Sequence, residues 1–239
     1  MTLDGTNTWV LSAPGATTGI VVDPGPDDER HLSAVLDVAR QRGIRIAATL
    51  LTHGHADHSA GARRFAELTG TGVRALDPAH RYGAEGLLDG EVIEADGLRL
   101  TVLATPGHTT DSLSFLLSEP GALLSGDTVL GRGTTVVAHP DGRLGAYLSS
   151  LNRLRELSAG LELLLPGHGP ALDRPTEVIE SYLSHRQARL DQVRTAVAAG
   201  ARTAPEVVEV VYADVDPVLW PAAELSVRAQ LEYLGQPPA

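Results

Sequence analysis

Residues 46–59 read Ile46-Ala47-Ala48-Thr49-Leu50-Leu51-Thr52-His53-Gly54-His55-Ala56-Asp57-His58-Ser59. An apolar run typical of a buried strand ends there, and four side chains that can bind metal follow it at once: His53, His55, Asp57 and His58. Residues two apart in an extended segment point to the same side, so we expect His53, His55 and Asp57 to converge. We expect His58 to point elsewhere. Such a dense cluster has little structural use, and it therefore predicts a metal site.

The same arrangement recurs three times further along the chain. Short apolar strands predicted at 98–104, 122–125 and 161–165 each lead into a turn with glycine and one ligand-type residue: His108, Asp127 and His168. Strand ends on one edge of a sheet are neighbours in space, where rigid strands set the positions and loops offer the ligands. We therefore expect one metal centre built from His53, His55, Asp57, His58, His108, Asp127 and His168.

The kind of donor limits the metal. Five histidines and two aspartates are too many for one tetrahedral ion, so they divide between two ions. A shared carboxylate holds such a pair about 3.5–4 Å apart. Imidazole and carboxylate donors without thiolate suit zinc, and they also accept manganese or iron. The predicted cofactor is two divalent metal ions, with Zn²⁺ placed first and Mn²⁺ or Fe as alternatives.

The order of predicted elements indicates the fold class. Strands at 7–11, 19–23, 44–51 and 114–117 join those named above, and helices at 28–41, 60–69 and 144–157 alternate with them. This alternation is typical of an α/β protein. After about residue 174 only helices are predicted, at 176–199, 203–212 and 217–234. The predicted domains are residues 1–173 and a C-terminal helical segment, 174–239.

Composition excludes several classes of protein. The 239 residues include no cysteine, which excludes disulfides, thiolate metal sites and cysteine nucleophiles. The net charge of −11 opposes binding to phosphate backbones. Apolar runs are too short to span a bilayer, and the first residues, Met1 to Gly5, do not resemble a signal peptide. We expect a cytoplasmic protein without a membrane partner.

The ligand motifs resemble the signature of a known family. Thr52-His53-Gly54-His55-Ala56-Asp57-His58, followed by His108, Asp127 and His168, is similar to the signature of the metallo-β-lactamase superfamily. The resemblance extends from about Thr6 to about Pro170 and implies an αββα sandwich with metals at one edge of the sheets. It also implies the ligand sets: His53, His55 and His108 on one metal, Asp57, His58 and His168 on the other, and Asp127 as the bridge.

Further motifs resemble the lactamase-like protein 2 group within that superfamily. They are Thr6-Asn7-Thr8, Ser125-Gly126-Asp127-Thr128-Val129-Leu130-Gly131-Arg132-Gly133-Thr134-Thr135, Pro166-Gly167-His168-Gly169-Pro170 and Tyr182-Leu183-Ser184-His185-Arg186. That group carries a winged-helix-like C-terminal segment, which the helices after Thr203 resemble. Its animal member is a single-strand endoribonuclease, its fungal relatives are thioesterases, and bacterial relatives are likened to glyoxalase II. Many true β-lactamases carry cysteine at the position of Asp127, so β-lactam hydrolysis is not expected.

These observations predict a binuclear metal-dependent hydrolase. Hydroxide held by the metals would attack an ester or thioester, as in glyoxalase II, and Asp57 would be the catalytic residue that orients the water or accepts its proton. A single-strand endoribonuclease is the alternative, and a mononuclear iron dioxygenase on the same fold is a further one.

The expected substrate is a small ester or thioester rather than RNA. Residues 174–239 carry six arginines, no lysine and nine acidic residues, which is unfavourable for a surface that binds nucleic acid. Five residues are candidates for contact with the substrate, although turn chemistry or helix packing explains them as well: Thr134, Thr135, His139, His185 and Arg186. Nothing in the sequence indicates an oligomeric state.

Overall fold

The computed structural model describes residues 5–237 and divides the chain into two compact units. Of the described residues, unit 1 comprises 5–105, 111–133 and 160–175, and unit 2 comprises 106–110, 134–159 and 176–237. The C-terminal helices thus form their own unit together with two segments from the middle of the chain. The division into residues 1–173 and 174–239 stays a prediction about domains.

Unit 1 contains two sheets. The first has the strand order β1-β2-β3-β4, with β1 antiparallel to β2 and the other pairs parallel. The second has the order β10-β9-β8-β7-β6-β5, in which only β8 and β9 are parallel. The strands are β1 (Trp9–Leu11), β2 (Thr18–Val22), β3 (Arg45–Leu50), β4 (Val73–Arg74), β5 (Val92–Ala95), β6 (Leu98–Ala104), β7 (Leu113–Leu117), β8 (Ala122–Gly126), β9 (Leu163–Pro166) and β10 (Leu172–Asp173).

The two sheets pack face to face around a common apolar core. Ile20, Val22 and Leu50 of the first sheet belong to the same buried cluster as Val102 and Phe115 of the second. Successive side chains of a strand point to opposite faces, so the residues that alternate with these core residues point away from the shared core. This packing makes unit 1 a sandwich in which the ends of several strands meet at one edge.

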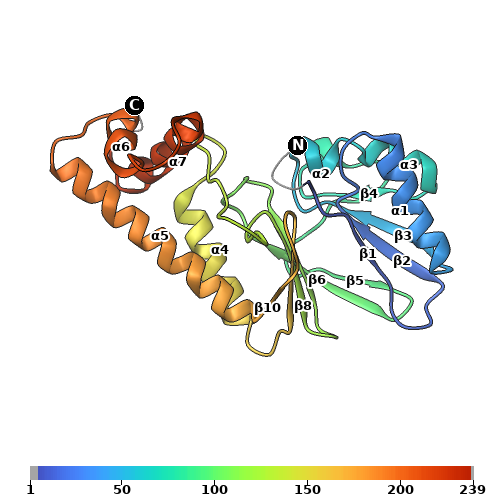
Figure 1. Cartoon of the computed structure of the whole chain (residues 1–239). Helices are drawn as coiled ribbons and strands as arrows, with labels where there is room; N and C mark the ends of the chain where they lie inside the picture. Colours follow the sequence, from blue (N-terminus) through green and yellow to red (C-terminus); the bar gives the residue numbers. More distant parts are fainter. Residues whose placement is uncertain (1–4, 238–239) are drawn as a thin grey trace. The chain divides into compact units, whose positions relative to one another are not determined.

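Helices cover the outer face of the first sheet. They are α1 (Glu29–Gln41) and α3 (Ala62–Thr69), and Figure 1 shows both beside strands β1–β4. Val21 and Ile46 pack there against Leu32 of α1 and Phe65 of α3. Because β2 is buried on both faces, its sequence is an unbroken apolar run, Ile20-Val21-Val22, instead of an alternating one.

Unit 2 is helical. It contains α4 (Leu144–Leu157), most of α5 (Pro175–Ala198), α6 (Ala204–Val211), the short helix η2 (Pro217–Leu219) and α7 (Trp220–Tyr233). Val193 of α5, Val207 and Val208 of α6, and Val227 and Leu231 of α7 share one buried cluster. A capping box starts α6, because Thr203 accepts from the Glu206 backbone N–H and the Glu206 side chain returns to the N-cap backbone.

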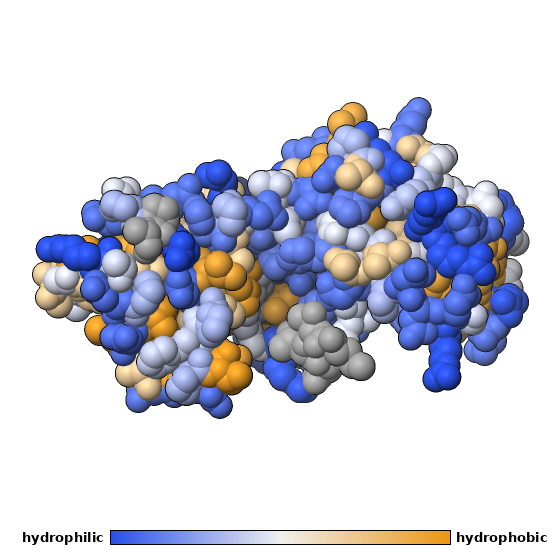
Figure 2. Space-filling view, turned by 90° about the horizontal axis from the view of Figure 1, so that it is seen from above, coloured by the Kyte–Doolittle hydropathy of each residue, from blue (hydrophilic) through white to orange (hydrophobic). Residues whose placement is uncertain are grey.

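The predicted α/β class with a C-terminal helical segment is confirmed. Four further elements were not predicted, because strands and helices of two to four residues carry too little pattern: α2 (Ala56–Ser59), β4, η1 (Pro78–His80) and β10. Strand β5 was also missed. Within residues 5–237, no helix combines the length and apolarity needed to cross a bilayer. Hydrophilic side chains dominate the face shown in Figure 2, with small groups of hydrophobic ones between them.

Candidate metal centre

The histidine cluster lies where strand β3 passes into a short helix. His55 is the N-cap of α2, so Asp57 and His58 lie on that helix. Successive helical residues are rotated by about 100°, which breaks the alternation expected for an extended loop. The segment is thus not the extended loop that was expected, and Asp57 groups with His58 and His168. The expectation that His58 points elsewhere was wrong, because His58 also groups with His53 and Asp127.

Two groups of donor atoms meet within unit 1. His53, His58 and Asp127 form one group, and Asp57, His58 and His168 form the other, with the donor atoms of each group within 4.8 Å of one another. The Nε2 atoms of His58 and His168 are 3.3 Å apart, and Asp127 Oδ2 and Asp57 Oδ2 each lie 3.3 Å from His168 Nε2. His53 Nε2 lies 3.0 Å from His55 Nδ1.

The ends of two neighbouring strands bring part of this cluster together. Asp127 follows β8 and His168 follows β9, and these strands run parallel, so both residues lie at the same edge of the sheet. Space between them is tight, since a Cβ on Gly167 would lie 2.3 Å from Asp127 Oδ1. The turn before His168 must therefore carry glycine, as the Pro166-Gly167-His168 motif does.

His108 is in unit 2, within the segment 106–110. Its Nδ1 lies 2.8 Å from the carbonyl oxygen of Val136 in the same unit. The chain joins His108 to unit 1 within three residues on each side, at Thr105 and Asp111. Its place on the first metal stays a prediction from the sequence.

The residues expected to contact substrate are also in unit 2, and their role stays a prediction. Thr134 is exposed, whereas Thr135 is buried. His139 and His185 are partly buried, and Arg186 is 8% exposed.

Asp23 is a residue of the centre that sequence analysis missed. It is 1% exposed and accepts hydrogen bonds from the Thr52 backbone N–H and hydroxyl, each at 2.7 Å. Its Oδ2 lies 2.9 Å from His58 Nδ1. A carboxylate that accepts from Nδ1–H fixes the ring and leaves Nε2 for a metal. The only signal in the sequence is an acid after an apolar strand, at the start of the turn segment Asp23-Pro24-Gly25-Pro26.

The N-terminal motif has a structural role at the same edge. The Thr6 hydroxyl donates to Asp57 Oδ2 at 2.9 Å, and the Asn7 side-chain amide donates to the carbonyls of Pro166 and Gly169 at 2.9 and 2.8 Å. These contacts hold the turn that carries His168 and orient the carboxylate of Asp57. The Thr6-Asn7-Thr8 motif is thereby part of the support around the cluster.

The ionisation of these groups is strongly coupled. Burial alone would lower the pKa of His58, but the carboxylates of Asp23 and Asp127 outweigh it and raise that pKa to about 10. Burial would raise the pKa of Asp127, but hydrogen bonds from His168 and His58 hold it far below its usual range. The pKa of Asp57 is lowered in the same sense, because the His58 charge and the Thr6 hydroxyl outweigh burial. The cluster is therefore charged at neutral pH without a metal.

This coupling predicts proton release when a metal binds. A histidine ligand must be neutral, so a metal has to displace the proton that His58 holds below about pH 10. Metal affinity should therefore rise with pH from neutral toward that value. Calorimetric titration of the metal-free protein at pH 7, in buffers of different ionisation enthalpy, should show protons released. Asp23→Asn removes a charge that raises the His58 pKa, so this variant should release fewer protons when it binds metal. If the unaltered protein released no protons, the expectation would be contradicted.

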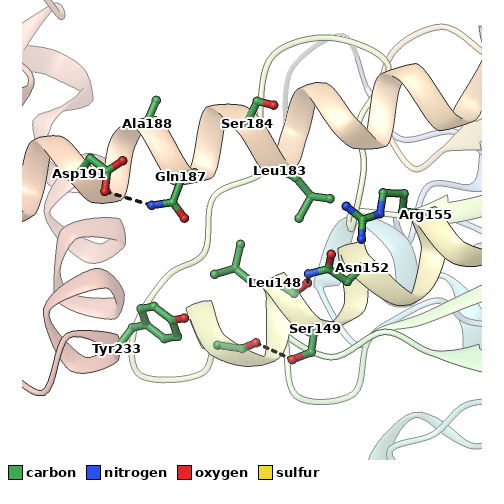
Figure 3. A pocket seen from close by; sticks show the side chains of 11 residues that line it. Leu148, Ser149, Asn152, Arg155, Leu183, Ser184, Gln187, Ala188, Asp191 and Tyr233 are labelled. Carbon is green, nitrogen blue, oxygen red and sulfur yellow. Dashed lines mark hydrogen bonds between the residues drawn. The ribbon is translucent and has the colours of Figure 1, made fainter.

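A separate pocket of about 1110 Å³ lies within unit 2. Figure 3 shows Asn152 and Arg155 of α4 and Leu183 and Gln187 of α5 around it, with Gln187 hydrogen-bonded to Asp191 at 3.0 Å. Tyr233 of α7 also lines the pocket. None of the residues predicted for the metal centre or for substrate contact lines it.

Comparison with known proteins settles the family. The family model for the metallo-β-lactamase superfamily matches residues 1–168. This chain belongs to the metallo-β-lactamase superfamily. A second family model, the β-lactamase-associated winged helix domain, matches residues 203–236, which confirms the winged-helix resemblance of the C-terminal helices.

Relatives of this metallo-β-lactamase superfamily chain include enzymes. It is 33% identical over 229 residues to an atrochrysone carboxyl ACP thioesterase from Aspergillus fumigatus, covering 89% of this chain and 70% of that protein. It is 35% identical over 222 residues to a β-lactamase-like protein 2 homolog from Caenorhabditis elegans, covering 89% and 72%. A solved metallo-β-lactamase family structure from Thermus thermophilus matches with a TM-score of 0.77 at 25% identity, covering 96% and 88%. The prediction of a hydrolytic enzyme of this superfamily is confirmed.

Proposed function

We propose that this protein is a binuclear metal-dependent hydrolase that acts on an ester or thioester. The observation that supports this proposal most is the greater solvent exposure of the Asp57 side chain compared with the donor side chains beside it. The Asp57 side chain is 30% exposed, while those of His58, Asp127 and His168 are 0%, 9% and 1% exposed. A carboxylate at the open side of a buried donor cluster is placed to contact both water and substrate.

The donors fit divalent metal ions. Imidazole nitrogens face one another at 3.0 and 3.3 Å with carboxylate oxygens close by, an arrangement that needs protons or cations between the atoms. We assign His53, His55 and His108 to one ion, Asp57, His58 and His168 to the other, and Asp127 to both. Zinc is the proposed metal, since no thiolate is present and the nitrogen and oxygen donors suit it.

Each side chain then has a defined task. The bound ions would lower the pKa of water and neutralise the negative charge that develops on the substrate. The lowered pKa of Asp57 keeps its carboxylate ionised at neutral pH and makes it a weak base. Its main task is therefore to orient the attacking water, with Thr6 holding the carboxylate in place. Asp23 holds His58 in the tautomer that presents Nε2.

Metal content is the direct test of the binuclear centre. Purified protein loaded with zinc should hold about two ions per chain, because seven ligand-type residues exceed the needs of one ion. Removal by a chelator should abolish hydrolysis, and zinc should restore it. Elemental analysis of the protein as purified, before zinc is added, that finds a single iron and no second ion would contradict this centre and favour the iron dioxygenase.

The proposed substrate class rests on charge and on one relative. Nucleic-acid affinity depends on basic side chains that neutralise phosphates, and the net charge of −11 opposes it. The Aspergillus fumigatus relative is a thioesterase by name. Ribonuclease activity is the second candidate, favoured by the match to a winged helix domain and by the resemblance to lactamase-like protein 2.

A paired assay ranks the two activities. We expect a higher kcat/KM for thioester or ester hydrolysis than for cleavage of single-stranded RNA, both measured at low salt with the same metal-loaded preparation. Asp127→Ala serves as the control for contaminating nuclease. RNA cleavage that disappears in this variant, without any ester or thioester turnover, would reverse the order of the two candidates.

A further inference from the structure

Arg186 is a buried arginine on the long helix α5. Its residue is 8% exposed, and no carboxylate lies within ion-pair distance among residues 5–237. The guanidinium donates to the carbonyl oxygen of Thr135 and lies over the ring of Tyr147, 5.0 Å from its centroid. Burial of a charge without a counter-charge is unfavourable, so these contacts must offset a substantial desolvation cost. Both contacts, and Arg186 itself, belong to unit 2.

The first contact leads to His108 through the backbone. Thr135 and Val136 are consecutive, and the carbonyl oxygen of Val136 is the atom that lies 2.8 Å from His108 Nδ1. A backbone carbonyl that accepts from Nδ1–H sets the tautomer and orientation of an imidazole and directs Nε2 outward. By holding the Thr135 carbonyl, Arg186 limits rotation of the neighbouring peptide that holds the ring.

The second contact, between Arg186 and Tyr147, connects to His108 through helix α4. A Cβ on Gly107 would lie 2.3 Å from the Tyr147 Cα, and Gly107 has a φ of +138° that disfavours any side chain. The Arg143 backbone N–H donates to the Gly107 carbonyl at 2.9 Å, and the Ser150 hydroxyl donates to the Pro106 carbonyl at 2.7 Å. The start of helix α4 therefore carries the turn on which His108 stands, and Arg186 packs on the Tyr147 ring of that helix.

We propose that Arg186 is a positioning residue that orients His108 for metal binding, through the Thr135–Val136 peptide and through Tyr147. The inference rests on the proposed function, which makes His108 a metal ligand. It assigns Arg186 an indirect role in place of direct contact with substrate, because the guanidinium is buried against these two supports. Residues that orient metal ligands typically change metal affinity or activity by about 10–100-fold when replaced.

The chain offers a matched control one helical turn further along α5. Arg189 makes the same two kinds of contact: its guanidinium lies 4.4 Å from the Tyr212 ring centroid, and it donates to the Val211 carbonyl at 3.0 Å. Those partners belong to the α6 region and not to the supports of His108. Arg189→Met therefore removes contacts of the same two kinds without touching the proposed path.

The experiment measures zinc affinity by competition with a chromophoric chelator and records the absorption spectrum of the cobalt-loaded protein. We expect Arg186→Met to lower the affinity for one of the two zinc ions by about tenfold or more and to change the absorption spectrum of the cobalt-loaded protein. Arg189→Met should leave both unchanged. His108→Ala identifies which of the two ions is affected. The double variant His108→Ala with Arg186→Met should have no lower affinity for that ion than His108→Ala alone, since Arg186 acts through His108. Arg186→Lys, which keeps the charge but loses the planar fork, should give an intermediate loss.

Unchanged affinities and an unchanged spectrum in Arg186→Met would overturn the inference. Where that variant does not fold, Arg186→Lys decides in its place by the same two readouts. A change in Arg189→Met equal to that in Arg186→Met would also overturn it, because packing alone would then explain both. The proposed function fails separately, if the unaltered protein holds two ions but hydrolyses no ester or thioester.

Discussion

Replacing Asp57 with Asn is expected to lower kcat by about 10²–10⁴-fold, because the variant loses the orientation of the attacking water together with any proton acceptance by the carboxylate. Asn keeps the shape of the side chain and can still accept from the Thr6 hydroxyl, but it loses the negative charge that binds metal and orients water. The measurement is steady-state ester or thioester hydrolysis by protein whose metal content is determined in the same sample. This comparison separates loss of chemistry from loss of metal.

Asp37→Asn is a suitable control for that experiment. Asp37 is an acid of helix α1 whose side chain is 54% exposed and pairs with Arg40. Surface pairs of this kind contribute little to stability, so the variant should fold normally. Its kcat should not change, because the donor cluster is unaltered. Near-normal turnover by Asp57→Asn with two metals bound would show that the role assigned to Asp57 is wrong.

Removal of Asp127 is expected to empty the centre. Its carboxylate lies 3.5 Å from His58 Nε2 and 3.3 Å from His168 Nε2, and its side chain is 9% exposed. Asp127→Ala removes the donor proposed to bridge both ions, so metal content should fall from about two ions per chain to under one. Hydrolysis should fall to background with it. Elemental analysis beside the activity assay measures both effects.

The same substitution should destabilise the metal-free protein. His58 is charged there at neutral pH and loses its contact with Asp127 while it keeps that with Asp23, so the cost should stay below about 3–5 kcal/mol, the cost of a buried charge left without any partner. Denaturant unfolding of metal-free Asp127→Ala and Asp127→Asn distinguishes charge from volume, since Asn keeps the volume. Full occupancy by two ions in the Asn variant would contradict the bridging role, because the negative charge would then be dispensable.

Much of the candidate site was predictable because metal chemistry leaves a local trace. His53, His55, Asp57 and His58 follow one apolar strand, and a cluster of this density has few other uses. Asp127 and His168 were also predictable, since each follows a short strand, and the parallel pairing of β8 and β9 places both at one edge. Strand periodicity, helix caps and glycine turns depend on neighbours in sequence, which is why the α/β class and most element bounds were predictable too.

Contacts between distant parts of the chain required the tertiary structure. The start of α2 at Ala56 decides that Asp57 groups with His58 and His168, and no capping signal marks so short a helix. Asp23 reaches His58 across 35 positions and Thr6 reaches Asp57 across 51. Such partners depend on how strands and turns are placed in space, and a single acid or threonine in a turn carries no pattern that reveals them.

The C-terminal helices also combine features that the sequence predicted with features that required the tertiary structure. Its helices, their capping box and their winged-helix resemblance were apparent from the sequence alone, because each is encoded within a short window. The burial of Arg186 was not, since a charged residue on a helix is ordinarily interpreted as facing water. Only the packing of α5 against Tyr147 and the Thr135 carbonyl decided its environment, because burial depends on which surfaces meet and not on the residues beside it in sequence.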